Sequence, residues 1–177
     1  MSAIVVAGNT SGSVTLDAPA VAGTTVITLP ATSGTMALAY VAPAFSAYSA
    51  SQQSVTANTW TKAIFGTEEF DTNSNFATSR FTPTVAGYYQ INATVTMNAY
   101  ATNPTYSAVA IYKNGSAVNT VYIGTSANYA SPTVSSIMSM NGTTDYIEIY
   151  GFNQSATGVF SPTQLLTFFN GAMIRSA

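Results

Sequence analysis

The stretch from Phe81 to Val95, FTPTVAGYYQINATV, indicates the fold of the chain. Its proline lacks an N–H and has a fixed φ, which suits a corner or a strand start better than the centre of a ladder. Gly87 accommodates either a bend or the close approach of another backbone. From Tyr89 onward apolar and polar residues alternate, so Tyr89 is predicted to face a core and Tyr88 the polar side. Such a strand is typical of an antiparallel sandwich.

The composition of the whole chain favours the same fold class. The 177 residues include eleven tyrosines and nine phenylalanines, and 47% are hydrophobic, so a packed core can form. Only 6% are charged, against about a quarter in ordinary domains. β-branched and aromatic residues dominate, and turn residues recur about every ten positions. The sequence therefore predicts an all-β sandwich or barrel.

Strands are expected throughout the chain after Ala44. The expected segments are AFSAYSA, KAIFG, ATSRFTPT, GYYQINATVTMNAY, YSAVAIYKNG, AVNTVYIG, TVSSIMSMNG, DYIEIYGF and TQLLTFFNGAMI. Asn114-Gly115 is expected to close a hairpin, because both central residues of a type I′ turn must accept a positive φ. Asn141-Gly142 is expected to repeat this turn before the strand in DYIEIYGF.

Several classes of function are excluded by what the chain lacks. Cysteine and histidine are both absent, so disulfides, the usual zinc ligands and Ser-His-Asp or Cys-His catalysis are not available. The net charge is −2 and the four basic residues are scattered singly, which argues against a nucleic-acid partner. No run of about 18 apolar residues is present, so no membrane span is expected. We do not expect an enzyme.

Residues 1–40 differ from residues 41–177 and are expected to form a separate N-terminal arm. They contain no aromatic residue before Tyr40, and they carry two similar segments, SVTLDAPA from Ser13 and VITLPAT from Val26. So little apolar surface cannot support a free-standing domain. We expect an extended arm that becomes ordered on sister chains or on a neighbouring protein. A flexible tail is the alternative.

The motifs of the head occur in an order that resembles a known family. They are AFSAY at Ala44, IF at Ile64, FD at Phe70, FTPTVAGYYQI at Phe81, YKNG at Tyr112, DYIEI at Asp145 and TFFNGAMI at Thr167. Together they resemble the complement C1q-like globular head, within the tumour necrosis factor (TNF)-like jelly rolls, over about Ala44 to Ala177. The resemblance implies an antiparallel jelly-roll sandwich that forms a compact homotrimer. It also implies a set of core or inter-subunit residues, which are Phe45, Phe81, Tyr89, Ile91 and Phe169.

The segment from Ser11 to Ala37 resembles a segment of structural proteins from tailed bacteriophages, where it often precedes a C-terminal knob. With a C1q-like head, it implies a protein of the phage particle surface whose arm binds other virion proteins. The first hypothesis is a short trimeric tail fibre whose knob contacts a glycan or protein of the host surface. A trimeric capsid decoration (cement) protein that clamps shell subunits is the second. A secreted or cell-surface binding module is the third.

Acidic residues provide one candidate site. Some C1q-like heads bind calcium near the trimer axis, but the resemblance assigns no such ligands in this sequence. Independently of the resemblance, Glu68, Glu69 and Asp71 lie within four positions and could supply oxygen ligands to calcium. They could also act as a carboxylate pair for glycoside hydrolysis, or belong to a solvated loop between strands. Beyond this possible calcium ion, no cofactor is expected. Asp145 and Glu148 flank a strand in which Ile147 and Ile149 are expected to face inward, so Glu148 shares the outward face with Tyr146 and Tyr150. This outward face is expected to lie in solvent, or to contribute to a sugar-binding or subunit-contact surface.

Aromatic residues near strand ends provide the second candidate site. Tyrosine in loops offers a large, rigid contact area with a polar tip, which can stack on the sugars of a glycan. Packing inside a trimer is the alternative role. The residues concerned are Tyr100, Tyr106, Tyr122, Tyr129 and Phe152.

Overall fold

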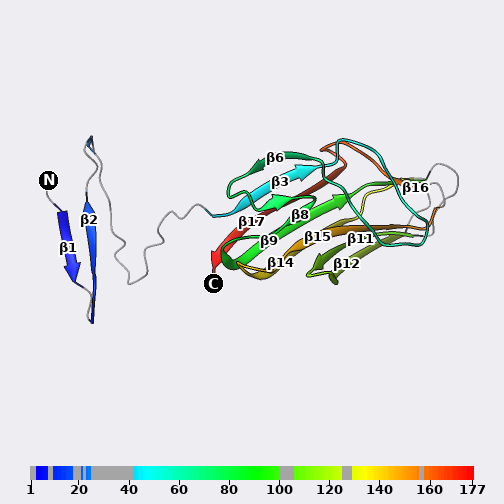
Figure 1. The fold of residues 1–177 in the computed structure, drawn as a ribbon. Helices are drawn as coiled ribbons and strands as arrows, with labels where there is room; N and C mark the ends of the chain where they lie inside the picture. Colours follow the sequence, from blue (N-terminus) through cyan, green and yellow to red (C-terminus); the bar gives the residue numbers. More distant parts are fainter. Residues whose placement is uncertain are drawn as a thin grey trace. The chain divides into compact units, whose positions relative to one another are not determined.

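The computed structural model describes residues 3–7, 10–17, 21, 23–24, 42–99, 106–124, 129–155 and 158–177. The chain divides into two compact units, Met1–Leu38 and Ala39–Ala177. Every regular element in the described residues is a β-strand (Figure 1). Within these residues no helix is long and apolar enough to cross a membrane.

The described part of the first unit is a two-stranded antiparallel hairpin. Strand β1 (Ala3–Ala7) pairs in full register with β2 (Ser13–Asp17). The apolar run AIVVA therefore supplies a partner strand that the sequence analysis did not anticipate. Ile4, Val5 and Val6 are 66%, 61% and 57% exposed, so side chains on both faces of this ribbon lie open. The second of the two similar segments, from Val26, lies outside the described residues.

The head contains a five-stranded antiparallel sheet in the order β14-β9-β17-β3-β6. Its strands are β14 (Thr133–Asn141), β9 (Ala86–Val95), β17 (Thr167–Ser176), β3 (Ala44–Tyr48) and β6 (Thr67–Asp71). Four shorter strands pair with one another in the order β13-β10-β16-β4. Each of them comes next before or next after one strand of the five-stranded sheet in the chain, so the two sheets have the same strand order. The shorter strands are β13 (Tyr129–Ala130), β10 (Met97–Ala99), β16 (Gly158–Phe160) and β4 (Gln53–Ser54). The short strands thus extend the five-stranded sheet.

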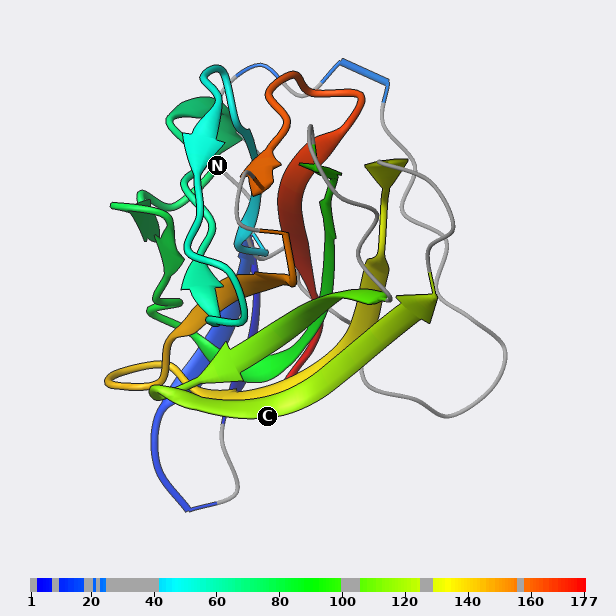
Figure 2. The same cartoon turned by 90° about the vertical axis from the view of Figure 1, so that its right-hand side faces the viewer.

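A six-stranded sheet forms the other layer of the sandwich (Figure 1 and Figure 2). Its path is β12-β11-β15-β8-β7, and β5 also pairs with β15. All its strand pairs are antiparallel. The strands are β5 (Thr61–Lys62), β7 (Phe76–Ala77), β8 (Arg80–Phe81), β11 (Tyr106–Lys113), β12 (Ser116–Gly124) and β15 (Ile147–Asn153).

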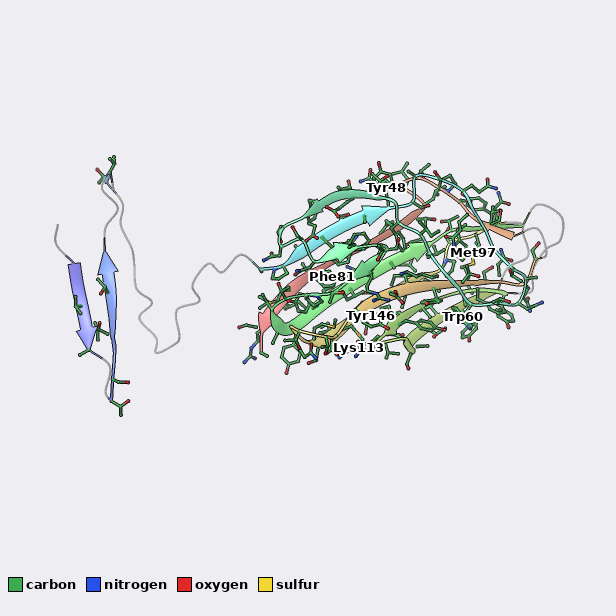
Figure 3. All side chains as sticks on the ribbon, in the orientation of Figure 1. Tyr48, Trp60, Phe81, Met97, Lys113 and Tyr146 are labelled. Carbon is green, nitrogen blue, oxygen red and sulfur yellow. The ribbon has the colours of Figure 1, made fainter. Side chains whose placement is uncertain are left out.

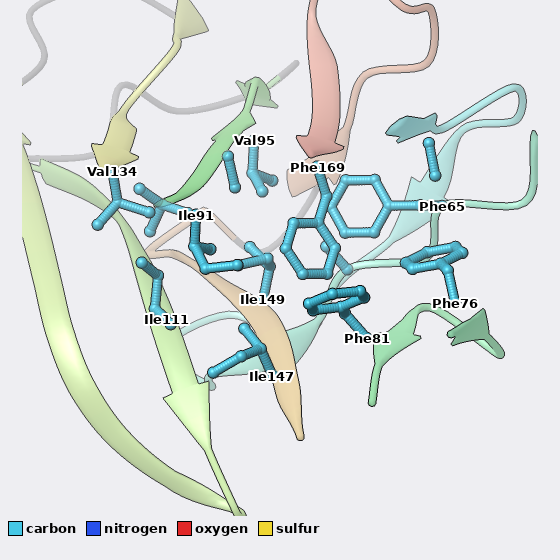
Figure 4. Packing of buried hydrophobic residues seen from close by; sticks show 14 of the residues in the cluster. Phe65, Phe76, Phe81, Ile91, Val95, Ile111, Val134, Ile147, Ile149 and Phe169 are labelled. Atoms are coloured by element: carbon cyan, nitrogen blue, oxygen red, sulfur yellow. The ribbon is translucent and has the colours of Figure 1, made fainter. Parts of the chain in front are cut away.

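The core lies between the two sheets and confirms the predicted strand faces. The ring of Phe45 stacks on that of Phe81 with centroids 4.3 Å apart and meets Phe169 edge-on at 4.7 Å. Figure 4 shows phenylalanines gathered in one part of this core and aliphatic side chains in the other. Seven residues are expected to lie in the core, either from the alternation in β9 or from the family resemblance. All of them are at most 1% exposed: Phe45, Phe81, Tyr89, Ile91, Ala93, Val95 and Phe169.

The proline and the glycine of the quoted stretch act as predicted. Pro83 lies in the corner between β8 and β9. Gly87 lies within β9, where a Cβ atom would come within 2.5 Å of the carbonyl oxygen of Arg175 on β17. The close approach of a neighbouring backbone, and not a bend, is therefore what requires glycine at this position.

One predicted hairpin turn is confirmed and the other is wrong. Asn114 and Gly115 have φ values of 53° and 81° and join the paired strands β11 and β12. After Asn141, however, the chain crosses between sheets, because β14 pairs with β9 whereas β15 pairs with β11. The side-chain oxygen of Asn141 accepts hydrogen bonds from three successive backbone N–H groups, ending at Asp145, and so organises a loop.

Two expected strands are much shorter than predicted. In KAIFG only Lys62 belongs to a strand, β5. The segment ATSRFTPT contains the end of β7 and all of β8, two-residue strands on either side of Thr78 and Ser79, which have φ values of 51° and 58°. Conversely, the segment from Thr67 to Asp71 forms β6, which was not expected because its apolar content is low.

Candidate binding surface

The three clustered acidic residues lie on β6, so their placement in a loop was wrong. Glu69 accepts hydrogen bonds from the hydroxyl of Ser46 and from the amide of Gln164. Asp71 accepts hydrogen bonds from the backbone N–H groups of Asn73 and Phe76. Among the described residues no group of three or more acidic side chains is arranged to hold a metal ion. The acidic residues of β6 are therefore not arranged in a way that supports calcium binding or carboxylate catalysis.

Glu148 is buried, which contradicts the prediction that it faces solvent. Its side chain is only 5% exposed, and its Oε1 atom accepts hydrogen bonds from Lys62 Nζ at 2.7 Å and Arg80 Nε at 2.9 Å. The strand alternation was read correctly, because Glu148 does point away from the core. The sequence did not show that β5 and β8 bring two long basic side chains over it.

The two basic neighbours keep Glu148 ionised. Burial alone would raise the pKa of this carboxyl group, but the hydrogen bonds and positive charges of Lys62 and Arg80 outweigh burial and lower it. A carboxylate held in this way is a poor proton donor at neutral pH. The cluster is therefore suited to holding charge in place and not to acid catalysis.

A second ion pair lies further along the same sheet. Lys113 Nζ lies 2.9 Å from Asp145 Oδ2, and the amide of Asn114 donates to Asp145 Oδ1 over 2.7 Å. The hydrogen bond from Asn114, followed by that from Lys113, lowers the pKa of Asp145. Asp145 thus fastens the β11–β12 turn to the loop before β15.

The distribution of charge over the chain is uneven. The outer side of the six-stranded sheet carries the basic residues Lys62 and Arg80 and the acidic residue Glu148, which leaves one net positive charge there. The remaining two basic and five acidic residues give the rest of the chain a net charge of −3. An acidic ligand is therefore favoured on this sheet over the rest of the molecule.

Four aromatic rings gather beside these ion pairs. Tyr106 stacks on Phe152 with centroids 5.5 Å apart and an interplanar angle of 7°. Tyr122 meets Tyr106 edge-on at 5.5 Å, and Trp60 lies 5.4 Å from Phe152. Figure 3 shows Trp60 and Tyr146 along this sheet.

Three more rings continue the row towards Glu148. Tyr112 stacks on Tyr150 at 4.0 Å, and Trp60 lies 6.4 Å from Tyr112. The Arg80 guanidinium carbon lies 3.9 Å from the centre of the Tyr146 ring, within the range of a cation–π contact. We call the seven rings together the aromatic face: Trp60, Tyr106, Tyr112, Tyr122, Tyr146, Tyr150 and Phe152.

The floor of the aromatic face is made of small residues. Ala108 pairs with Tyr122 on one side and with Phe152 on the other, and Ala110 pairs with Tyr150. Both alanines are fully buried although they point away from the core. The neighbouring rings therefore lie across the sheet and cover the middle strand.

Two hydroxyl groups on this face, those of Tyr112 and Tyr150, are neutral donors. Burial raises the pKa of Tyr112, and the neighbouring Tyr122 adds to the rise. Burial also raises the pKa of Tyr150, with a further contribution from the negative charge of Glu148. Both phenols consequently stay protonated at neutral pH and can donate hydrogen bonds.

The structure gathers three of the five aromatic residues predicted to bind a ligand. Tyr106, Tyr122 and Phe152 belong to the aromatic face. Tyr129 is exposed on β13, in the extension of the other sheet, and Tyr100 lies outside the described residues.

The list of candidate aromatic residues omitted four members of the aromatic face: Trp60, Tyr112, Tyr146 and Tyr150. The sequence does place Tyr146 and Tyr150 with Glu148 on the outward face of their strand, with a sugar-binding surface as one possible role. Alternation in YSAVAIYK places Tyr112 on the same side as Tyr106, so this pattern could have found Tyr112 as well. Trp60 precedes a two-residue strand, so no periodicity indicated its position.

The outer side of the five-stranded sheet has a different character. Tyr88, Ile137 and Ile174 are 45%, 61% and 56% exposed there. In the next row of the sheet the amide of Asn92 donates to Asn170 over 3.1 Å. The result is a broad surface with exposed apolar side chains beside a polar pair.

Comparison with known proteins identifies the fold. No protein-family model and no curated protein matches the sequence. Among solved structures, the globular domain of zebrafish complement 1qA has a TM-score of 0.55 and 16% identity, and the match covers 77% of this chain and 99% of that one. Murine APRIL at pH 5.0 has a TM-score of 0.60 and 10% identity over 75% of this chain and 99% of that one.

A third similar structure is Eiger TNF from S. frugiperda, with a TM-score of 0.59 and 7% identity over 77% of this chain and 94% of that one. The head is thus an all-β antiparallel sandwich with the C1q/TNF-like jelly-roll fold, as the order of its motifs predicted. Identities this low establish the fold alone.

Proposed function

We propose that this chain is a non-enzymatic trimeric protein of a phage particle surface, most simply a short tail fibre whose head contacts the host. The observation that carries the proposal is the contrast between the two outer surfaces of the sandwich. One displays exposed apolar side chains beside a polar pair, and the other displays seven aromatic rings beside two ion pairs that share the buried carboxylate of Glu148. We assign the first surface to trimer contacts and the second to the host.

Trimer contacts through the five-stranded sheet have a physical basis. Tyr88, Ile137 and Ile174 would be removed from water, which at about 25 cal/mol per Å² favours association. The neighbouring polar pair, Asn92 and Asn170, would supply hydrogen bonds that fix the arrangement. Three copies of a weak binding site on one rigid head would then gain avidity. The resemblance to C1q-like heads supports a homotrimer.

The attachment role of the arm is also a proposal. It is supported by the likeness of the segment from Ser11 to Ala37 to phage structural proteins, and by the exposed hairpin of β1 and β2. A two-stranded ribbon is marginally stable by itself, so these apolar side chains favour a partner surface. Another virion protein would provide that surface.

Capsid decoration is the second candidate function. The same exposed ribbon favours it, because Ile4, Val5 and Val6 could clamp a neighbouring shell subunit. In that case the head would stabilise the particle and its aromatic face would not need a host ligand.

Three measurements test the proposal. Sedimentation equilibrium of the full chain should give the mass of a trimer, and a monomer would contradict the proposal. The number of copies of the chain per particle should be measured against the major shell protein of purified particles. A number typical of tail proteins is expected, whereas a number comparable to that of the shell subunits would indicate decoration. The fluorescently labelled chain should bind cells of a susceptible strain, and lack of binding would count against the tail fibre.

A further inference from the structure

The aromatic face has no assigned ligand, although its rings and charges are arranged as a continuous strip. We propose that it binds an acidic glycan, meaning an oligosaccharide whose sugars carry carboxylate groups. This inference rests on the proposed function, since it names the class of ligand that a host-contacting head would recognise.

The rings supply the apolar half of such a site. One face of a pyranose ring carries mainly C–H groups, and it packs well on an aromatic ring that has a polar group near its edge. Tyr122 is 60% exposed, and Trp60 and Phe152 lie beside it and are partly exposed. The protonated hydroxyl of Tyr112 is available to sugar oxygens further along the strip, whereas that of Tyr150 donates to Glu148 over 3.5 Å.

The basic residues supply the charged half of the site. Lys62 pairs directly opposite Tyr150, so its ammonium group lies next to the rings. Arg80 donates through Nε to Glu148, and neither of its η nitrogens has a hydrogen-bond partner among the described residues. Its side chain is 42% exposed. A sugar carboxylate can therefore accept hydrogen bonds from the free edge of this guanidinium group.

Glu148 explains how the two cations can lie so close together. Its buried carboxylate neutralises one of the two positive charges and fixes Lys62 and Arg80 in place. One positive charge remains for the ligand. The cluster thus acts as a preorganised anion site whose geometry does not depend on the ligand.

The length of the strip indicates an oligosaccharide. Phe152, Tyr150 and Glu148 are alternate residues on the outer side of β15. At about 3.3 Å per residue, Phe152 and Glu148 are about 13 Å apart along the strand. Aromatic stacking at one end and carboxylate binding at the other therefore involve different sugars of one chain.

Two other ligand classes fit less well. A protein partner fits less well because the centres of protein interfaces are depleted in charged residues, whereas this strip contains Lys62, Arg80 and Glu148. A nucleic acid needs several basic residues to neutralise phosphates, but this face has one net positive charge.

The single tryptophan of the chain makes the proposal directly testable, because Trp60 lies within the aromatic face. The full chain is titrated with short oligomers of galacturonic acid, of sialic acid and of hyaluronan, and with neutral galactose oligomers of matched length, while tryptophan emission is recorded. At least one acidic oligomer should change the emission saturably, and the neutral oligomers should bind about tenfold more weakly, the ratio expected for one charge-assisted contact of about 1.4 kcal/mol.

Matched variants separate binding from folding. Tyr122→Ala should weaken the acidic oligomer at least fivefold, whereas Tyr129→Ala, which removes another exposed tyrosine outside the aromatic face, should leave binding unchanged. Arg80→Gln should abolish the preference for acidic over neutral oligomers. Each variant is first checked for wild-type mass and melting temperature. Equal losses in Tyr122→Ala and Tyr129→Ala would overturn the inference.

The outcome also distinguishes this inference from the proposed function. If the labelled chain binds susceptible cells but no acidic oligomer changes Trp60 emission, the ligand class is wrong and the host-contacting role stands. If Tyr122→Ala abolishes binding to a host protein while no oligomer binds, the face recognises protein and the glycan inference is overturned. If neither cells nor oligomers bind, both proposals fail.

Discussion

The hydroxyl of Tyr89 donates a hydrogen bond to the carbonyl oxygen of Val85 over 2.7 Å. Tyr89 is fully buried in β9, and Val85 lies in the corner just before that strand. One side chain thus fills the core with its ring and holds the corner with its hydroxyl. A tyrosine that binds the backbone a few residues upstream at a strand corner is a recurrent feature of β-sandwiches.

Replacing Tyr89 by phenylalanine should destabilise the head modestly. The ring and its contact with Phe81 remain, but the hydrogen bond to Val85 is lost, which costs about 1 kcal/mol. Urea unfolding at a fixed protein concentration, monitored by circular dichroism, measures this cost. The slope of the transition should not change, because the surface exposed on unfolding stays the same. No loss of stability would mean that the hydrogen bond does not hold the corner.

Replacing Gly87 by alanine should destabilise the head by about 2–4 kcal/mol, in the range reported for overpacked or strained sites. The added methyl group would lie 2.5 Å from the carbonyl oxygen of Arg175, so the pairing of β9 and β17 must shift. Valine should be worse because it is larger. The melting temperatures of both variants measure the effect.

Gly66 provides the control for this prediction. An added Cβ atom at Gly66 meets nothing within 4 Å, and Gly66 is not among the residues with positive φ. Gly66→Ala should therefore be neutral or slightly stabilising, because it reduces the freedom of the unfolded chain. If both alanine variants melt at the same temperature, crowding at Gly87 is not the reason for its glycine.

The sequence predicted the central strands of the fold well because their patterns are local. In β9 and β15 the alternation of apolar and polar residues correctly predicted which side chains point inward, including Tyr89 and Ile149. The Asn114-Gly115 turn was also correct, since its chemistry resides in two adjacent residues. The strand at Thr67–Asp71 was missed because an edge strand needs little apolar surface on either side.

The candidate site was predicted only in part because it depends on distant contacts. Alternation correctly placed Glu148 on the side away from the core, but solvent exposure there is decided by Lys62 and Arg80, which lie 86 and 68 residues away in sequence. Likewise, Trp60 reaches Phe152 only because β5 pairs beside β15. Periodicity within one strand carries no information about the strand next to it.

Glu148 should make the stability of the head depend on pH. Its pKa in the folded state is below the ordinary value for glutamate, so its contribution is fully present above that ordinary value. As the pH falls through the lowered pKa, Glu148 takes up a proton and the contribution is lost. Urea unfolding at a series of pH values should show stability declining in this acidic range.

Glu148→Gln isolates this contribution from that of Asp145, whose pKa is also lowered. At neutral pH the variant should lose about 2 kcal/mol, since charge-assisted hydrogen bonds from Lys62 and Arg80 are weakened. Towards acidic pH the difference from the wild type should shrink, because both side chains are then uncharged. A difference that stays constant with pH would show that Glu148 does not titrate in this range.

Replacing Ile137 by arginine should dissociate the proposed trimer. Ile137 is 61% exposed on the outer side of the five-stranded sheet, so the substitution should leave the core intact while placing a charge in each subunit contact. Desolvation and repulsion between copies then oppose association. Val118→Arg is the matched control, since Val118 is a 50% exposed β-branched residue on β12 of the other sheet. Sedimentation should find a folded monomer for Ile137→Arg and a trimer for Val118→Arg. The opposite result would assign subunit contacts to the six-stranded sheet, and the aromatic face would then lie inside the assembly.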